Sequence, residues 1–223
     1  MKSSFSESDL YIGQTVSGIY TYTKLKAEYI VLKAISSGLN GMILRIGNIT
    51  NRFEDGMFQK NYNDNAFAKR LKSFIEIGAF PDYFLDHELE LTPVDICAKA
   101  IISAINYESN CNLLHIYNNN LLSIKLLLQT LTDLGIKLIP VPKLMMSDII
   151  TGILQDNSRK EILSGIIYDL DKNKNLIYTS NISLESKFSN KYLSQTGFHW
   201  NKITETYLKK CFNYFNNINF INF

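Results

Sequence analysis

The first clear pattern of apolar and polar positions predicts a helix over residues 19–37, closed by Gly38. Its apolar residues recur at three- and four-residue steps and include Leu25, Tyr29, Leu32 and Ile35. A short apolar run bounded by glycines follows at residues 41–47, and such a run is typical of a buried parallel strand. A helix followed directly by a buried strand indicates an α/β protein.

The alternation of helices and short strands continues to about residue 142. The predicted helices span residues 63–77, 92–106 and 123–134, the predicted strands span 88–91, 113–117 and 137–141, and the predicted loops span 1–18, 48–62 and 78–84. Asn63 and Thr92 are the expected N-caps of two of these helices, because their side chains can accept hydrogen bonds from free backbone N–H groups.

From residue 143 onward the pattern is helical or irregular. Helices are expected at 143–155, 158–169, 183–195 and 202–216. We therefore expect an α/β part over residues 1–142 and a helical cap over residues 143–223, packed on it.

Composition narrows the possible functions. Apolar residues make up 46% of the chain and charged residues 20%, so a sizeable core is expected. The 23 basic and 21 acidic residues are scattered, which argues against a nucleic-acid partner. No apolar run approaches the roughly 18 residues of a membrane span, so no membrane partner is expected. The unpaired spacing of Cys97, Cys111 and Cys211 predicts neither a zinc site nor disulfides, and favours a cytoplasmic protein.

A tyrosine and a lysine one helical turn apart, Tyr20 and Lys24, are the first candidates for chemistry. Side chains at this spacing project from the same face of a helix. Such a pair is suited to acid–base work, with the phenol giving a proton to a substrate oxygen while the lysine binds a nicotinamide ribose. The spacing alone is weak evidence, because it occurs at Tyr20/Lys24, Tyr22/Lys26, Tyr29/Lys33 and Tyr168/Lys172.

The end of the strand at residues 41–47 is the second candidate. In open α/β sheets, ligands bind beyond the carboxyl ends of the strands, and Gly47, Asn48 and Ile49 occupy that position here. A glycine allows close approach of the backbone to a ligand. This context favours Tyr20 over the other tyrosines, because it lies in the first turn of the preceding helix.

Several other polar residues have simpler structural interpretations. His87 is expected in a surface loop, His115 in a sheet with its hydrogen bonds satisfied, and His199 in packing between helices. Asp95 is interpreted as a helix-capping carboxylate. Arg45 has two open interpretations, a local ion pair or support of the site.

Five motifs occur in a fixed order along the chain. They are FSESDLYIGQ at 5–14, YTYTKLKAE at 20–28, LRIGNIT at 44–50, IGAFPD at 77–82 and PVD at 93–95. In this order the sequence resembles the thioester reductase domains that end nonribosomal peptide synthetases, within the extended short-chain dehydrogenase/reductase superfamily. The resemblance covers about residues 5–105. Thr23 stands where the family usually has serine.

The resemblance implies a site. Tyr20 and Lys24 would be catalytic, and these two residues together with Gly47, Asn48 and Ile49 would bind the nicotinamide cofactor. The cofactor of the family is generally NADPH, with NADH as the alternative. The partner implied is a peptidyl or acyl carrier domain, whose phosphopantetheine arm holds a thioester that is reduced and released as an aldehyde or an alcohol.

The resemblance also implies that part of the fold is supplied elsewhere, because no glycine-rich strand-turn-helix fingerprint occurs in the sequence. Residues 1–142 would then be the C-terminal half of an NAD(P)-binding, Rossmann-like, doubly wound parallel sheet, and residues 143–223 a helical substrate-binding cap. The upstream half of the reductase domain would be a partner. On this hypothesis the isolated chain binds cofactor weakly and is inactive.

Three alternatives stay open at this point. The chain could come from a fatty acyl reductase or from a nucleotide-sugar epimerase or dehydratase of the same superfamily, although IGAFPD and PVD disfavour the sugar enzymes. It could also be a non-catalytic remnant that binds a carrier domain.

Overall fold

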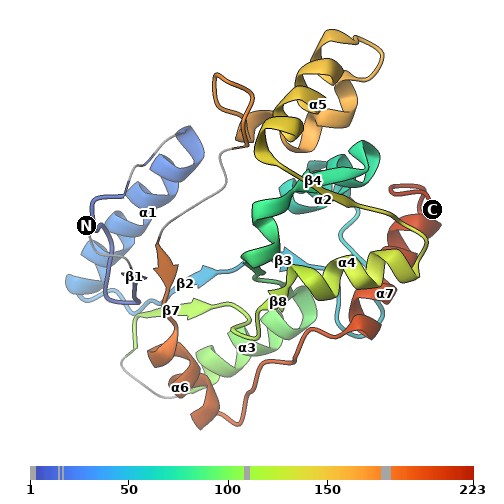
Figure 1. Cartoon of the computed structure of the whole chain (residues 1–223). Helices are drawn as coiled ribbons and strands as arrows, with labels where there is room; N and C mark the ends of the chain where they lie inside the picture. Colours follow the sequence, from blue (N-terminus) through green and yellow to red (C-terminus); the bar gives the residue numbers. More distant parts are fainter. Residues whose placement is uncertain (1–3, 15, 17, 108–110, 177–181) are drawn as a thin grey trace. The chain divides into compact units, whose positions relative to one another are not determined.

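The computed structural model of the chain describes residues 4–14, 16, 18–107, 111–176 and 182–223 (Figure 1). Its α-helices are α1 (Ile19–Ser36), α2 (Ala66–Ile77), α3 (Val94–Asn106), α4 (Ile124–Asp133), α5 (Lys143–Gln155), α6 (Lys187–Gln195) and α7 (Glu205–Asn217). Short 3-10 helices span Tyr62–Asp64, Asp82–Asp86, Lys160–Gly165 and Ile167–Asp169. Among these described helices, none is long and apolar enough to cross a membrane.

The strands are short, and within the described residues they pair two by two. The parallel pairs are β1 (Ser4–Phe5) with β10 (Ser183–Leu184), β2 (Ile43–Ile46) with β7 (Leu113–Ile116), β3 (Ile49–Thr50) with β6 (Thr92–Pro93), and β4 (Ala79–Pro81) with β9 (Ile139–Val141). The antiparallel pair is β5 (Glu88–Leu89) with β8 (Leu122–Ser123). Parallel strand pairs that alternate with helices along the chain confirm the predicted α/β class.

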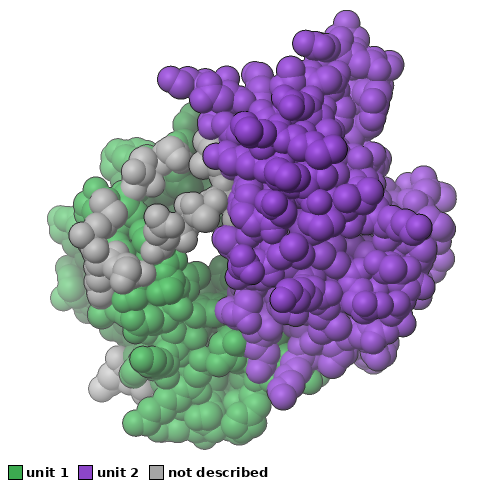
Figure 2. Space-filling view, viewed as in Figure 1, with its two compact units in different colours: residues 1–47, 96–119, 180–201 green, residues 48–95, 120–179, 202–223 purple. Residues whose placement is uncertain are grey.

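The chain forms two compact units, coloured separately in Figure 2. The first unit contains residues 1–47, 96–119 and 180–201, and the second contains residues 48–95, 120–179 and 202–223. The predicted division into an NAD(P)-binding part at residues 1–142 and a substrate-binding cap at residues 143–223 is a division by role, and it stays a prediction.

In the first unit the register of β2 on β7 determines which polar groups meet. Arg45 lies directly opposite His115, and Ile46 lies opposite Ile116. Beyond the strand, the backbone N–H of Gly47 donates to the carbonyl of Ile116 at 3.0 Å. Ile116 is fully buried, whereas Ile46 is exposed, so β2 is less buried than the sequence predicted.

The core of the second unit forms where α2, α4 and α5 pack around β4 and the 3-10 helix at Lys160–Gly165. Its most deeply buried members include Phe80, Ile150, Leu163 and Ile166. Gly165 lies so close to α2 that a Cβ built there would be 2.1 Å from the carbonyl oxygen of Lys69. The backbone N–H of Gly165 also donates to the Ser73 hydroxyl at 3.1 Å.

Most predicted elements are confirmed, including the helices now seen as α1, α4 and α5 and the strands now seen as β2, β7 and β9. The helix predicted at 92–106 is seen as α3 but begins only at Val94, because Thr92, the predicted N-cap, and Pro93 pair with β3 as strand β6. The predicted loop at 78–84 is wrong, because these residues form β4 and the start of a 3-10 helix. Here Gly78 ends α2 in the left-handed conformation, and the next three residues are all buried. Tertiary burial therefore overrides the turn-like composition of this segment.

Other local predictions also need correction. The predicted loops at 1–18 and 48–62 contain β1 and β3, which are too short to show a periodicity. The helix predicted at 158–169 consists of 3-10 segments, and the one predicted at 183–195 starts only at Lys187, after β10. The N-cap of α2 is Asn65, whose side chain accepts from the N–H of Ala68 at 2.9 Å, and not Asn63.

Candidate functional site

The predicted Tyr–Lys pair lies at the start of α1, in the first unit. The Lys24 ammonium is 5.6 Å from the centre of the Tyr20 ring, and both side chains are exposed. Tyr20 is 73% exposed. The Thr23 hydroxyl, at the position where the related family has serine, donates to the Tyr20 carbonyl at 2.9 Å. The phenol and the ammonium are thus presented together to solvent and to any ligand that arrives there.

A second Tyr–Lys pair on the same helix has nearly the same local geometry. The Lys26 ammonium is 5.4 Å from the centre of the Tyr22 ring, and Tyr22 is 51% exposed. Local geometry therefore does not single out Tyr20 and Lys24. Tyr20 and Lys24 are preferred over Tyr22 and Lys26 because Tyr20 lies in the first turn of α1 and because of the order of the neighbouring motifs.

Arg45 joins α1 to β2 and to the N-terminal segment. Its Nε donates to the two carboxylate oxygens of Glu28 at 3.0 and 3.2 Å, and its Nη2 also binds this carboxylate. Nη2 donates to the Asp9 carbonyl at 2.6 Å, and Nη1 donates to the Ser6 carbonyl at 3.3 Å. The guanidinium also lies 4.8 Å from the centre of the Phe5 ring. Arg45 therefore fixes the helix that carries the Tyr–Lys pair.

His115 is part of this arrangement and is structural, as predicted. Its Nδ1 lies 2.6 Å from the Glu185 carbonyl, and its Nε2 lies 2.9 Å from Nη1 of Arg45. The carbonyl can only accept, so Nδ1 carries the proton and Nε2 accepts from the guanidinium. Burial, together with the charge of Arg45, lowers the pKa of His115 below its ordinary value, and the ring is held neutral.

Glu7 completes the network in the first unit. It accepts hydrogen bonds from the backbone N–H of Ser189 at 2.9 Å and from its hydroxyl at 2.6 Å. Burial alone would raise the pKa of this carboxyl, but the bonds from Ser189 outweigh it and the pKa of Glu7 is lowered. Glu7, in the motif at residues 5–14, therefore has a structural role, because its carboxylate binds Ser189 of α6.

The residues predicted beyond the end of β2 are divided between the two units. Gly47 lies in the first unit with Tyr20 and Lys24, whereas Asn48 and Ile49 lie in the second. The Asn48 N–H donates to Glu90 Oε2 at 2.6 Å, and its Nδ2 donates to the Glu90 carbonyl at 3.4 Å. Ile49 is paired with Thr92 in the β3–β6 ladder.

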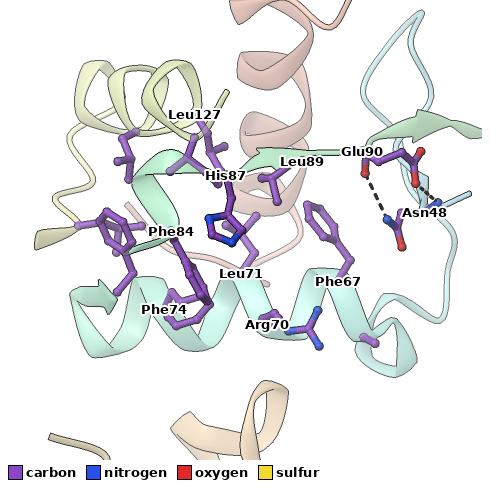
Figure 3. Close-up of a pocket in the computed structure, with 15 residues that line it drawn as sticks. Asn48, Phe67, Arg70, Leu71, Phe74, Phe84, His87, Leu89, Glu90 and Leu127 are labelled. Atoms are coloured by element: carbon purple, nitrogen blue, oxygen red, sulfur yellow. Dashed lines mark hydrogen bonds between the residues drawn. The ribbon is translucent and has the colours of Figure 1, made fainter. Parts of the chain in front are cut away.

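The second unit contains a cavity of about 200 Å³ next to Asn48 (Figure 3). Its walls come from α2, α4, β5 and the segment between β4 and β5. The lining is mainly apolar and comprises Ala66, Phe67, Leu71, Phe74, Phe80, Phe84, Leu89, Ile124, Leu127, Leu128 and Leu138, together with the polar residues Asn48, Arg70, His87 and Glu90.

The charged groups at the cavity are already bound to other protein groups. Burial raises the pKa of Glu90, partly offset by hydrogen bonds from Asn48 and Thr92. Arg70 donates from Nε and Nη2 to one carboxylate oxygen of Asp169, at 2.9 and 2.6 Å. The cavity therefore offers no free cation from Arg70.

The sequence does not reveal this cavity. Phe67, Leu71 and Phe74 share one face of the helix predicted at 63–77, but their spacing does not show that these three side chains line a cavity. An apolar stripe on a helix looks the same in sequence whether it meets side chains or an open space.

Asp95 makes contacts that its predicted role as a helix cap does not include. Its Oδ1 accepts from the Phe53 N–H at 2.8 Å, and its Oδ2 accepts from the Glu54 N–H at 3.3 Å. The carboxylate therefore orders the loop after β3, a long-range contact that local sequence does not reveal.

Comparison with known protein families supports the resemblance inferred from the motifs. Residues 2–101 match the NAD_binding_4 family, described as "Male sterility protein". This match covers the Tyr–Lys helix, Arg45 and the end of β2. It does not reach the cap predicted at residues 143–223.

Solved and curated relatives point to terminal reductase domains. The chain is 27% identical to a thiolation-reductase di-domain from an archaeal non-ribosomal peptide synthetase, with a TM-score of 0.82, covering 97% of this chain and 44% of that one. It is 30% identical to L-2-aminoadipate reductase of Saccharomyces cerevisiae over 40% of this chain and 6% of the relative. It is 29% identical to a linear gramicidin synthase protein of Brevibacillus parabrevis over 63% of this chain and 3% of the relative. The predicted resemblance to synthetase reductase domains is confirmed, and the chain spans less than half the length of each of these relatives.

Proposed function

We propose that the chain carries the substrate side of an NAD(P)H-dependent reductase that releases a carrier-bound peptidyl or acyl thioester as an aldehyde or an alcohol. The observation that carries this proposal is the Tyr20–Lys24 pair on a helix that Arg45 ties to β2, the strand directly before Gly47. The same residues make up the motifs that resemble terminal reductase domains. The relatives' names, which include a reductase and two peptide synthetases, support the same class of reaction.

The reaction balances without a metal. When bound, a nicotinamide cofactor would supply the hydride that reduces the thioester carbonyl carbon to an aldehyde, with the carbon–sulfur bond broken and the carrier thiol released with a proton. If a second hydride were added to the aldehyde, its oxygen would have to receive a proton to give the alcohol. Tyr20 is the proposed donor of that proton, and Lys24 would bind the ribose beside the phenol.

The residues present fit one end of the cofactor. An exposed phenol and ammonium on one helical face suit a ribose and a carbonyl oxygen, and Gly47, directly after β2, has no side chain that would obstruct a nicotinamide ring. Asn48 and Ile49 are proposed to complete this end of the site. No glycine-rich cradle for the pyrophosphate occurs in this sequence. We therefore expect weak cofactor binding by this chain alone, and we propose NADPH over NADH from the resemblance.

The proposed partner is a carrier domain with a phosphopantetheine arm. The solved relative is named as a thiolation-reductase di-domain, and thiolation domains carry the thioester. Residues 1–142 are proposed to serve the cofactor side and residues 143–223 the substrate side. No observation favours the sugar epimerase, the fatty acyl reductase or the non-catalytic remnant over this reading.

The proposal is tested by replacing one hydroxyl. Tyr20→Phe removes the proton donor and leaves the ring, and the matched control Tyr22→Phe removes the hydroxyl of the neighbouring Tyr–Lys pair. Thioester-dependent oxidation of NADPH is measured with this chain and a glycine-rich dinucleotide-binding half supplied as a second polypeptide. We expect Tyr20→Phe to reduce turnover by about 100-fold or more, with little change for Tyr22→Phe. Equal effects of the two substitutions would refute the assignment.

A further inference from the structure

We propose that the cavity of the second unit binds the uncharged, apolar side chain of the acyl group whose thioester is reduced. The inference rests on the proposed function for the identity of the ligand, but the cavity and its chemistry are independent of it. It assigns a specificity role to α2, α4 and the segment between β4 and β5, none of which contains a residue proposed for hydride transfer. These elements lie within residues 1–142, so the inference adds a substrate-binding part to the half of the chain that is proposed to serve the cofactor side.

The size of the cavity sets the size of the group. Its volume is about 200 Å³, and a cavity of about 150 Å³ lined by Leu, Ile and Phe is known to stay dry and accept benzene. One aromatic ring with a short linker, or a branched chain of similar bulk, is therefore the expected occupant. A free amino acid head group would not gain from the apolar part of this environment, because it would lose its hydration there.

The walls of the cavity determine its polarity. Phe67, Leu71 and Phe74 project from successive turns of α2, and Leu127 and Leu128 come from α4 (Figure 3). Each apolar group that leaves water for such a site gains free energy in proportion to its buried area. The edges of the aromatic rings also favour another ring.

The charges around the cavity argue against an acidic side chain. The cation that could pair with a carboxylate, Arg70, already donates twice to Asp169. The acidic group at the cavity, Glu90, would repel a second carboxylate when ionised. An acyl group with a carboxylate at its far end would thus be rejected, and an uncharged one accepted.

The position of the polar residues at the cavity predicts how the acyl group is oriented in it. Asn48 and Glu90 lie together at one edge of the cavity, joined by the hydrogen bond from the Asn48 N–H (Figure 3). The polar thioester group is therefore expected at this polar edge, with the apolar end of the acyl group among the leucine and phenylalanine side chains.

The direct test is binding, measured without catalysis. N-acetylcysteamine thioesters of phenylacetic acid and of succinic acid are titrated into the 223-residue chain and followed by calorimetry, with N-acetylcysteamine alone as the blank. We expect the phenylacetyl thioester to bind at least about tenfold more tightly than the succinyl one, since a buried unpaired charge is costly. Equal affinities, or tighter binding of the succinyl thioester, would overturn the inference.

Two leucine variants locate the binding. Leu128→Trp fills the cavity, and the matched control Leu144→Trp adds the same side chain at a position of α5 that is 78% exposed. We expect about tenfold weaker phenylacetyl binding for the first variant and no change for the second. If circular dichroism shows that Leu128→Trp does not fold, Leu128→Ala replaces it, and the enlarged cavity is expected to favour a naphthylacetyl thioester. Unchanged selectivity in the folded variants would place the ligand elsewhere.

Tyr20→Phe separates this inference from the proposed function. The substitution is expected to leave phenylacetyl binding unchanged while turnover falls by about 100-fold or more. With the glycine-rich dinucleotide-binding half supplied, reduction of phenylacetyl and succinyl thioesters at equal rates would support the reductase and refute the cavity's role. Selective binding without reduction in the same mixture would support the cavity and refute the reductase.

Discussion

At the scale of single residues, Arg45 is the group on which the order of the first unit depends most. It binds the Glu28 carboxylate on α1 and backbone carbonyls near the N-terminus, and only 16% of its side chain is exposed. A planar guanidinium can satisfy these acceptors together, whereas an ammonium on a flexible stem cannot. The sequence left its role open between a local ion pair and support of the site. The structure shows the ion pair, with Glu28, and support of the site stays a prediction.

Arg45→Lys is expected to destabilise the chain by about 2 kcal/mol, because several partly buried acceptors lose a partner. The measurement is the free energy of unfolding in urea. Arg52→Lys is the control, since Arg52 is 42% exposed and pairs with Glu54 and Asp55 at the surface. For this control a change below about 0.5 kcal/mol is expected. Similar losses in both variants would contradict the role of Arg45.

His115 predicts a dependence of stability on pH. Its pKa in the folded chain is lowered below 6.5, first by burial and further by Arg45, while Glu7 and Glu28 act in the opposite direction. As the pH falls below 6.5, His115 therefore becomes protonated in the unfolded chain while it stays neutral in the folded chain. The contribution of neutral His115 to the free energy of unfolding is complete above pH 6.5 and is lost as the pH falls toward the pKa of His115 in the folded chain.

The check is urea unfolding at about pH 7.5 and about pH 5.5, with His115→Gln as the comparison. The wild-type chain should lose more stability between these two values than the variant does. The contribution of Glu7 falls in a separate window, below its ordinary pKa of 4.5, because its pKa is lowered in the folded chain. Identical slopes for the wild type and the variant would show that His115 does not titrate as described.

At the scale of elements, the start of α2 shows what sequence reasoning captures and what it misses. The pattern predicted the helix and its end at Ile77, but it placed the cap at Asn63. The structure inserts a 3-10 turn at Tyr62–Asp64, so the cap moves to Asn65. Both asparagines are good caps, and only the path of the chain decides between them.

Asn65→Ala should therefore cost about 1 kcal/mol, since the Ala68 N–H loses its acceptor. Asn63→Ala, at the cap that the sequence suggested, should cost much less. Thermal unfolding followed by circular dichroism distinguishes the two. A larger effect at Asn63 would mean that the helix starts where the sequence placed it.

Gly165 tests the packing of its 3-10 helix on α2. Gly165→Ala brings a methyl group against the Lys69 carbonyl, and a loss of about 1 to 3 kcal/mol is expected from overpacking. In the control Gly152→Ala, the new methyl group on α5 meets nothing within 4 Å, and a gain of about 0.5 to 1 kcal/mol is expected. Urea unfolding measures the change in stability for both variants. A change of the same sign in both would contradict the close approach of Gly165 to Lys69.

At the scale of the whole molecule, the sequence predicted the α/β class and the resemblance to terminal reductases, because long periodic helices and ordered motifs are local signals. It could not predict the network around Arg45 and His115, which forms only when β2 pairs with β7. It also missed the cavity, whose lining comes from stretches as far apart as Asn48 and Leu138. Contacts between distant segments leave no spacing that a single sequence can show.

The central claim is that this chain directs a hydride to a thioester carbonyl, and an isotope measurement tests it most directly. The chain, with a glycine-rich dinucleotide-binding half supplied as a second polypeptide, is given a carrier-bound phenylacetyl thioester and NADPH deuterated at its hydride-donating carbon. We expect deuterium on the former carbonyl carbon of the released aldehyde or alcohol, and formation of this product about 100-fold or more slowly with Tyr20→Phe. Release of phenylacetic acid without deuterium, or no release although the cofactor binds, would contradict it.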